Sequence, residues 1–265
     1  MTTRAELLYL IQTLLRQEPA YQGVRIPDGF DEQRRLLRDL MNLWQPGPLP
    51  EEFWRLQDQL LSEERQLRGI VEPNALPAEP GRPRLFLWQG DITRLAADAI
   101  VNAANSQLLG CFVPGHMCID NVIHSAAGLE LRRECAEIMA GQGHEEPAGQ
   151  AKLTKGYNLP AKHVLHTVGP IISQLLPGER VSAGDRQLLA SCYRSCLELA
   201  AENGLESVAF CCVSTGVFRF PREQAAQVAL ETVEDWLAGN KRIRQVIFNV
   251  FLDEDYRIYR ELLNA

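Results

Sequence analysis

An uncharged segment of the sequence brings two cysteines and one histidine close together. Cys111, His116 and Cys118 fall within the short run Gly110–Cys118, and no Asp, Glu, Lys or Arg occurs in Ala99–Ile119. Thiolates and imidazoles are ligands that zinc prefers, and three protein ligands leave the fourth position for water or substrate. The spacing therefore predicts an open, catalytic type of zinc site with one Zn²⁺ per chain. Two buried thiols beside an unrelated histidine are the alternative interpretation.

Two polar residues follow this loop on a helix that we expect over Cys118–Ala140. Asp120 and His124 lie just downstream of Cys118, so either can orient a metal ligand or face the substrate. The remaining thiols are interpreted as small core residues: Cys135, Cys192, Cys196, Cys211 and Cys212. Three further histidines are interpreted as structural: His144, His163 and His166.

Four segments close or follow predicted strands: Gln89–Thr93, Val101–Ser106, Ser214–Pro221 and Asn249–Asp253. In an open α/β sheet, binding sites lie beyond the carboxyl ends of the strands, so these segments can share one edge. Gly216 lies in a turn between a strand and a helix that begins at Pro221. Backbone N–H groups in such a turn can bind a phosphate, and this needs no basic patch.

The other segments carry groups suited to a nucleotide ligand. Asp91 can accept a hydrogen bond from an exocyclic amine such as that of adenine, or it can cap the turn after the first strand. Asn102 and Asn105 can bind sugar hydroxyls, or they can form Asx turns. Aromatic faces for a ribose or base, or alternatively core side chains, are Phe218, Phe220 and Phe251.

Short apolar runs alternate with helical stretches from residue 84 onward, which favours a three-layer α/β fold with a mixed or mostly parallel central sheet. The expected strands are Leu85–Trp88, Ala99–Asn102, Ala151–Thr154, Val164–Thr167, Val208–Val213 and Val246–Phe251. The expected helices, besides Cys118–Ala140, are Asp185–Asn203, Arg222–Leu237 and Asp253–Leu263.

The N-terminal part of the chain has a different pattern. Apolar residues repeat at helical spacing in three stretches, separated by the breaker runs Pro27–Gly29 and Pro46–Pro50. The sequence predicts a helical N-terminal extension over 1–72, a Pro-rich connector over 73–83 and the main domain over 84–265. We expect the helices to pack on the main domain as a small bundle; a partner-binding surface is the alternative.

Composition excludes several classes of function. The chain has 265 residues, with 27 Lys and Arg against 34 Asp and Glu, for a formal charge of −7. This balance argues against a protein that binds nucleic acid or anionic membranes in general, because such binding requires a basic surface patch. The seven cysteines are an odd number, and Met1–Leu15 lacks the pattern of a signal peptide. We therefore expect a cytoplasmic protein whose cysteines are thiols or metal ligands.

Taken together, these segments resemble the macrodomain family, which binds ADP-ribose. The resemblance runs from about Arg84 to the C-terminus and rests on three segments: Gly90–Thr93, Val101–Ser106 and Ser214–Pro221. The Gly110–Cys118 loop, followed by Ile119–His124, further resembles the zinc-containing macrodomains of microbes, which also carry a helical N-terminal extension. Most hydrolytic macrodomains have a glycine-rich stretch where this chain has its Cys/His loop, and that departure indicates the zinc-containing branch.

The resemblance implies a protein-ADP-ribose hydrolase that removes mono-ADP-ribose from modified side chains, with Asp or Glu esters as the expected linkage. Asn105 would then orient the distal ribose, and Asp120 or a substrate phosphate would activate water. Zinc would be held by Cys111, His116 and Cys118. The implied substrate-binding residues are Asp91, Ile92, Asn102, Ser214, Thr215, Gly216, Val217, Phe218 and Phe251.

The resemblance also implies partners, and it leaves alternatives open. Some relatives are encoded with a sirtuin-type ADP-ribosyltransferase and with a lipoyl-carrier protein, which makes the modified carrier a candidate substrate. A non-catalytic ADP-ribose reader module shares the adenine and phosphate loops. An O-acetyl-ADP-ribose deacetylase would use the same site on a free ester. A zinc ion that only braces the loop is a further alternative.

Overall fold

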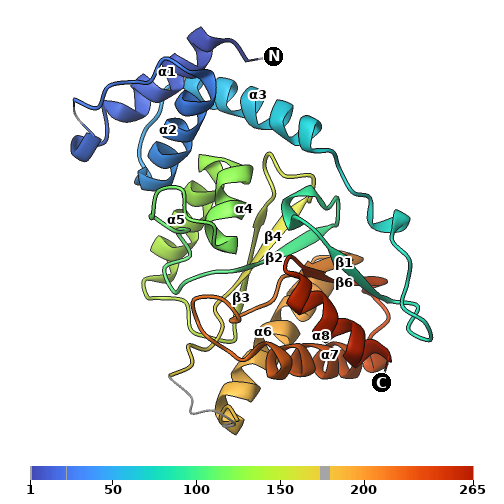
Figure 1. The fold of residues 1–265 in the computed structure, drawn as a ribbon. Coiled ribbons are helices and arrows are strands. Elements are labelled where there is room, and N and C mark those ends of the chain that lie inside the picture. Colours follow the sequence, from blue (N-terminus) through green and yellow to red (C-terminus); the bar gives the residue numbers. More distant parts are fainter. Residues whose placement is uncertain (1, 22, 174–179, 265) are drawn as a thin grey trace.

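The chain folds around two apolar cores, one among the N-terminal helices and one around a central sheet (Figure 1). The computed structural model describes residues 2–21, 23–173 and 180–264. The N-terminal helices are α1 (Arg4–Leu15), α2 (Phe30–Leu43) and α3 (Glu51–Arg68). Thr3 begins α1 with a capping box that it shares with Glu6. Leu129 of the main domain joins the core of these helices, so the expected packing of the bundle on the main domain is observed.

A six-stranded mixed sheet forms the centre of the main domain, in the order β1-β6-β5-β2-β4-β3. Only β3 runs antiparallel, against β4, and the other neighbouring strands are parallel. The strands are β1 (Leu85–Gln89), β2 (Ala99–Ala103), β3 (Ala151–Lys155), β4 (His163–Thr167), β5 (Ser207–Phe210) and β6 (Gln245–Val250).

Helices cover both faces of this sheet, which confirms the three-layer α/β prediction (Figure 1). On one side α4 contacts β2 and α5 contacts β3; on the other, α6 contacts β4, α8 contacts β1, and α7 packs between α6 and α8. The α-helices are α4 (Ile119–Ala127), α5 (Leu129–Gln142), α6 (Ala183–Glu202), α7 (Arg222–Gly239) and α8 (Asp253–Asn264). Short 3₁₀ helices are η1 (Pro19–Tyr21), η2 (Pro73–Ala75) and η3 (Ile92–Arg94).

The prediction of one helix over Cys118–Ala140 is wrong, because the chain breaks into α4 and α5 at Gly128. The φ angle of Gly128 is +100°, and a Cβ there would lie 2.8 Å from Nε2 of Gln57 and 3.0 Å from Oε2 of Glu130. The backbone at this position is in the positive-φ region that favours glycine, and the side chain of Gln57 from α3 packs closely against it. Apolar periodicity does not record such an approach, so it continues across the break.

The predicted strand Val208–Val213 is also too long, since β5 ends at Phe210. Residues 211–213 leave the sheet and lead into a turn in which Ser214 has a φ of +66°. Their apolar side chains indicated burial but not where strand pairing ends. The other predicted strands and helices of the main domain are confirmed to within one or two residues at each end.

The carboxyl ends of the parallel strands gather the polar segments at one edge of the sheet. The chain after β4 lies directly against the loop after β5, because a Cβ on Gly169 would lie 1.9 Å from Oγ of Ser214. No helix among the described residues is both long and apolar enough to cross a membrane. The boundaries at 72 and 83 stay a prediction.

Candidate active site

The loop between β2 and α4 brings Cys111 and His116 together through a tight turn. The backbone N–H of His116 donates to the carbonyl O of Val113 at 3.2 Å, with Pro114 and Gly115 between them. The φ angle of Gly115 is +63°, which a type II turn requires at its third position, and proline suits its second. The Pro-Gly pair therefore reverses the chain between the two candidate ligands.

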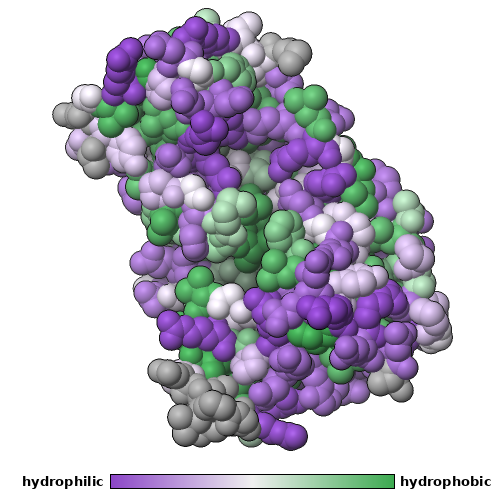
Figure 2. Space-filling model, viewed as in Figure 1, coloured by the Kyte–Doolittle hydropathy of each residue, from purple (hydrophilic) through white to green (hydrophobic). Residues whose placement is uncertain are grey.

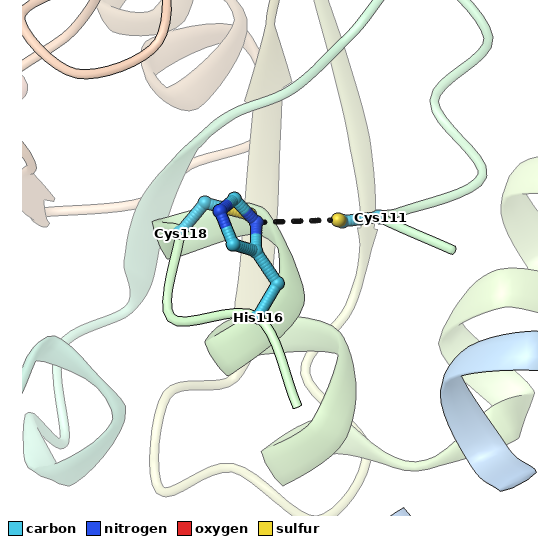
Figure 3. A group of neighbouring side chains, drawn as sticks. All are labelled: Cys111, His116 and Cys118. Carbon is cyan, nitrogen blue, oxygen red and sulfur yellow. Dashed lines mark hydrogen bonds between the residues drawn. The ribbon is translucent and has the colours of Figure 1, made fainter. Parts of the chain in front are cut away.

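The side chains of Cys111, His116 and Cys118 point toward one another (Figure 3). One ligand atom from each lies within 4.8 Å of the others, and Sγ of Cys111 is 3.5 Å from Nδ1 of His116. All three residues are half-buried, so the group stays accessible from solvent. Two sulfur atoms and one imidazole nitrogen are a donor set that fits Zn²⁺. The three residues predicted as metal ligands are thus brought together.

Cys118 has a second role as the N-cap of α4. Its Sγ accepts a hydrogen bond from the backbone N–H of Asn121 at 3.4 Å. Burial raises the pKa of the Cys118 thiol to about 11, and the neighbouring Cys111 and Asp120 also raise it. The free thiol is therefore protonated at neutral pH. Zinc would displace this proton on binding, so metal affinity would increase with pH.

Asp120 lies in the first turn of α4, next to the end of β2. Its Oδ1 accepts a hydrogen bond from Nδ2 of Asn102 at 2.7 Å, and Nδ2 of Asn105 lies 3.5 Å from its Oδ2. Burial raises the pKa of Asp120 to about 6. Asn102 is fully buried beneath this carboxyl group, so its amide orients Asp120 and does not face a ligand directly. The two asparagines and the aspartate form one unit.

Two buried histidines lie behind this unit. Nε2 of His124 is 3.5 Å from Oδ1 of Asp120, and Nδ1 of His166 is 3.2 Å from Nδ2 of Asn102. Burial lowers the pKa of His166 to about 3 and lowers that of His124 well below its ordinary value, so both rings are neutral. Ligand atoms of these rings and of Cys135 lie within 4.8 Å of one another, but the group is fully buried. We interpret it as the floor beneath Asp120.

Asp91 caps η3, which follows β1. Its Oδ1 accepts hydrogen bonds from the N–H and Oγ1 of Thr93, at 2.9 and 2.7 Å. Nη1 of Arg68, at the end of α3, lies 3.6 Å from its Oδ2. The capping role is therefore observed, while the side chain stays partly exposed and open to a further donor. Ile92 is buried, so only its backbone can contact a ligand.

The loop after β5 presents backbone N–H groups close to the start of α7. Ser214 is buried, whereas Gly216 and Val217 are exposed. No described residue accepts a hydrogen bond from the N–H groups of Gly216, Val217 or Phe218. Thr215 is half-buried, and its Oγ1 donates to the carbonyl O of Cys212 at 3.0 Å. A row of N–H groups near a helix N-terminus is suited to a diphosphate.

An exposed aromatic side chain follows β6. Phe251 is 68% exposed, so it is not a core residue and can stack on a base or ribose. Nδ2 of Asn249 donates to the carbonyl O of Gly90 at 2.9 Å, which ties the end of β6 to the turn before Asp91. Apolar residues gather in the middle of the face that Figure 2 shows, below the N-terminal helices.

Four polar residues around the Cys/His loop were not predicted as site residues: Arg38 and Asn42 from α2, Asn121 from α4 and Arg132 from α5. Arg38, Asn42 and Arg132 make these hydrogen bonds to segments that reach them only in the folded chain. No local motif indicates such contacts. The two α2 residues lie 78 and 73 positions before the loop residues that they bind.

Comparison with known proteins assigns the family. Residues 101–229 match the family model described as Macro domain. A Treponema medium protein named protein-ADP-ribose hydrolase is 52% identical and covers 100% of both chains. A Fusarium oxysporum f. sp. cubense protein named probable bifunctional ADP-ribose hydrolase/ADP-ribosyltransferase is 42% identical, over 86% of this chain and 40% of its own. The crystal structure of a Trypanosoma brucei macrodomain in complex with ADP-ribose is 34% identical, with a TM-score of 0.64, over 85% of this chain and 94% of that one. Together with the fold and loops described above, these matches show that this chain belongs to the macrodomain family.

Proposed function

We propose that this chain is a zinc-dependent hydrolase that removes mono-ADP-ribose from modified protein side chains, with aspartate and glutamate esters as the linkage. The name of the Treponema medium relative supports the hydrolase activity, and the Trypanosoma brucei complex supports ADP-ribose as the ligand. We also assign the protein to the cytoplasm, because all seven cysteines are free thiols.

The observation that carries the proposal is the position of the Cys111, His116 and Cys118 group beside Asp120. Asp120 follows Cys118 by two residues, and amides at the end of β2 hold its carboxyl group. A module that only binds ADP-ribose gains little from an accessible metal-ligand group next to a buried carboxyl group. The pairing therefore favours an enzyme over a reader.

When bound by these three side chains, Zn²⁺ would supply Lewis-acid polarisation of oxygen ligands and would stabilise developing negative charge. The backbone of residues 214–218 holds the diphosphate, and Asn105 orients the distal ribose. Asp120 accepts a proton from the attacking water as the water oxygen bonds to the anomeric carbon. The bond from that carbon to the ester oxygen breaks, and the carboxylate leaves with the electron pair. Positioning and electrostatics thus suffice without a protein nucleophile.

Functional pairing with a sirtuin-type ADP-ribosyltransferase, acting on a lipoyl-carrier protein, extends the proposal to partners. Its support is the resemblance to the zinc-containing branch. The Fusarium relative adds to this, because its name joins a hydrolase and an ADP-ribosyltransferase in one chain. The transferase would attach the group that this chain removes.

Metal analysis and a chelator-controlled hydrolysis assay test the proposal. The substrate is a protein mono-ADP-ribosylated on aspartate, and we expect one zinc per chain, loss of hydrolysis on chelation and recovery with added zinc. Cys118→Ala removes a ligand, so we expect it to abolish zinc binding and hydrolysis while the protein still unfolds cooperatively. Cys196→Ala, in α6, is the matched control and should keep both. Full activity of Cys118→Ala would contradict the proposal.

The same assay separates the alternatives. Tight binding of ADP-ribose with no turnover of any ester would identify a reader. Faster turnover of O-acetyl-ADP-ribose than of modified protein would change the substrate to the free ester. If zinc only braced the loop, chelation would lower thermal stability and ADP-ribose affinity together; a catalytic zinc predicts that hydrolysis is lost before binding.

A further inference from the structure

The Cys/His loop contacts α2 of the N-terminal region directly. Nη2 of Arg38 donates to the carbonyl O of His116 at 3.2 Å, and its Nη1 lies 3.8 Å from Sδ of Met117. Oδ1 of Asn42 accepts a hydrogen bond from the backbone N–H of Gly115 at 3.1 Å. Backbone groups on both sides of the His116 Cα are therefore bound by one helix that lies far away in sequence.

Asn121 connects these contacts to the two cysteines. Its Nδ2 donates to the carbonyl O of Cys111 at 3.4 Å and to that of Val113 at 3.0 Å. Its backbone N–H donates to Sγ of Cys118, and its Oδ1 accepts from Nη2 of Arg38 at 3.0 Å. One fully buried residue thus links both cysteines to Arg38 of α2, and Arg38 itself binds the carbonyl O of His116.

A second chain of hydrogen bonds closes the network. Nδ2 of Asn42 donates to Oγ of Ser125 at 3.0 Å, and this hydroxyl donates to Oδ1 of Asn121 at 3.1 Å. Asn42 is 2% exposed, so its amide has no competing contact with solvent. Both ends of the Asn42 amide are therefore used, one on the ligand loop and one on α4.

Arg132 of α5 fixes the end of α2 against the same loop. Its Nη1 donates to the carbonyl oxygens of Met41, Asn42 and Trp44, at 3.0, 2.9 and 2.7 Å. These are terminal carbonyls of α2 that have no partner within the helix. The guanidinium group also lies 4.4 Å from the centre of the Phe112 ring, next to Cys111. The position of α2 and that of the loop are thus coupled through one buried cation.

We propose that Arg38 and Asn42 are positioning residues of the metal site, so that the N-terminal helical region forms part of that site. The loop over residues 104–118 has no helix or strand of its own, so contacts from outside must offset the entropy of ordering it. Outer contacts that orient metal ligands contribute about 10–100-fold to metal affinity. The inference rests on zinc binding as proposed above, but not on hydrolysis.

Zinc affinity, measured by competition with a chromogenic chelator, tests the inference. Arg38→Met keeps the apolar stem and removes the donors, so we expect zinc to bind about 10–100-fold more weakly. Arg34→Met is the matched control on the same helix. Arg34 pairs with Glu64 of α3, with Nη2 to Oε2 at 2.9 Å, and this pair lies within the N-terminal region. It should leave zinc affinity unchanged.

Asn42 supplies an independent pair of variants. Asn42→Leu removes both hydrogen bonds at similar volume and should weaken zinc binding. Asn42→Asp keeps an acceptor for the Gly115 N–H and should recover part of the loss. In cobalt-loaded protein, Asn42→Leu should also change the visible absorption bands, which report ligand geometry at the metal.

Thermal unfolding with and without zinc separates positioning from general destabilisation. A bound ligand raises Tm by an amount that depends on its affinity for the folded state. A positioning role predicts that the zinc-induced rise in Tm shrinks in Arg38→Met but not in Arg34→Met. If Arg38 has a structural role alone, Arg38→Met lowers Tm equally with and without zinc, and the zinc-induced rise in Tm is unchanged.

Two outcomes overturn the inference alone. In the first, Arg38→Met binds zinc as tightly as the parent protein does; in the second, Arg38→Met and Arg34→Met lose equal amounts of zinc affinity. A parent protein that binds zinc but hydrolyses its substrate equally well after chelation overturns the proposed function and leaves this inference intact. A parent that binds no zinc overturns both.

Discussion

Replacing Gly110 by alanine would test how rigidly the ligand loop is held. Gly110 precedes Cys111, has a φ of +80°, and its carbonyl O accepts from Nδ2 of Asn105 at 3.1 Å. A Cβ at this position would lie 2.9 Å from Cγ and 3.1 Å from Nδ1 of the His124 ring. His124 is 4% exposed and belongs to α4, so its ring cannot swing into solvent.

Two costs add in Gly110→Ala. The left-handed backbone costs about 1–2 kcal/mol for a residue with a side chain. Overpacking against a buried ring costs about 1–3 kcal/mol. We therefore expect the free energy of unfolding to fall by about 2–5 kcal/mol. Gly143, which ends α5, is the control, because its φ is +75° and a Cβ there would meet no atom within 4 Å. Gly143→Ala should lose only about 1–2 kcal/mol.

Urea unfolding of the parent and both variants measures this difference, and chelator competition on the same samples measures zinc affinity. Any shift that relieves the contact with His124 also moves Cys111. Zinc should therefore bind more weakly to Gly110→Ala, whereas the zinc affinity of Gly143→Ala should be unchanged. Equal losses of stability would refute the steric argument. A larger loss of stability in Gly110→Ala, together with a zinc affinity equal to that of the parent, would refute the coupling of this backbone to the ligands.

Three further predictions concern pH, catalysis and ligand stacking. Burial raises the pKa of Glu130 to about 7, and Asp58 adds to the rise. The folded protein therefore binds this proton more tightly than the unfolded chain does. The contribution of the proton to the free energy of unfolding is fully present below about pH 4.5 and is lost as pH rises through 7. The free energy of unfolding of Glu130→Gln, relative to that of the parent, should therefore rise by about 3 kcal/mol between about pH 4.5 and 8, as measured by urea unfolding. Parallel pH profiles of the two proteins would contradict this. Asp120→Asn keeps the side-chain volume but removes the base, so kcat should fall about 10²–10⁴-fold while calorimetry shows ADP-ribose still bound; a parent kcat would exclude Asp120 as the base. Phe251→Ala should weaken ADP-ribose binding by about 1–3 kcal/mol without lowering Tm, because the ring is exposed; an equal effect of Leu252→Ala would argue against stacking.

Much of the fold could be predicted from the sequence because its signals are local. Alternating apolar runs and helical stretches indicated the three-layer fold, and the predicted strand ends were right to within one residue except in β5. The two errors share a cause. The chain breaks at Gly128, where φ is +100° and Gln57 of α3 packs against the backbone, and β5 ends early where the chain leads into the turn at Ser214. Apolar patterning reports burial and carries no record of which neighbour the backbone meets.

The sequence by itself determined the composition of the candidate metal group. Cys111, His116 and Cys118 lie within one short loop, and the Pro-Gly turn between the first two needs only local geometry to bring them together. Tertiary structure alone decided what surrounds that group. Asn102 lies beneath Asp120 because β2 and α4 pack together, and α2 reaches the loop because the N-terminal core extends to Leu129. Such hydrogen bonds join residues remote in sequence, and their donors and acceptors meet only when packing brings separate elements into contact.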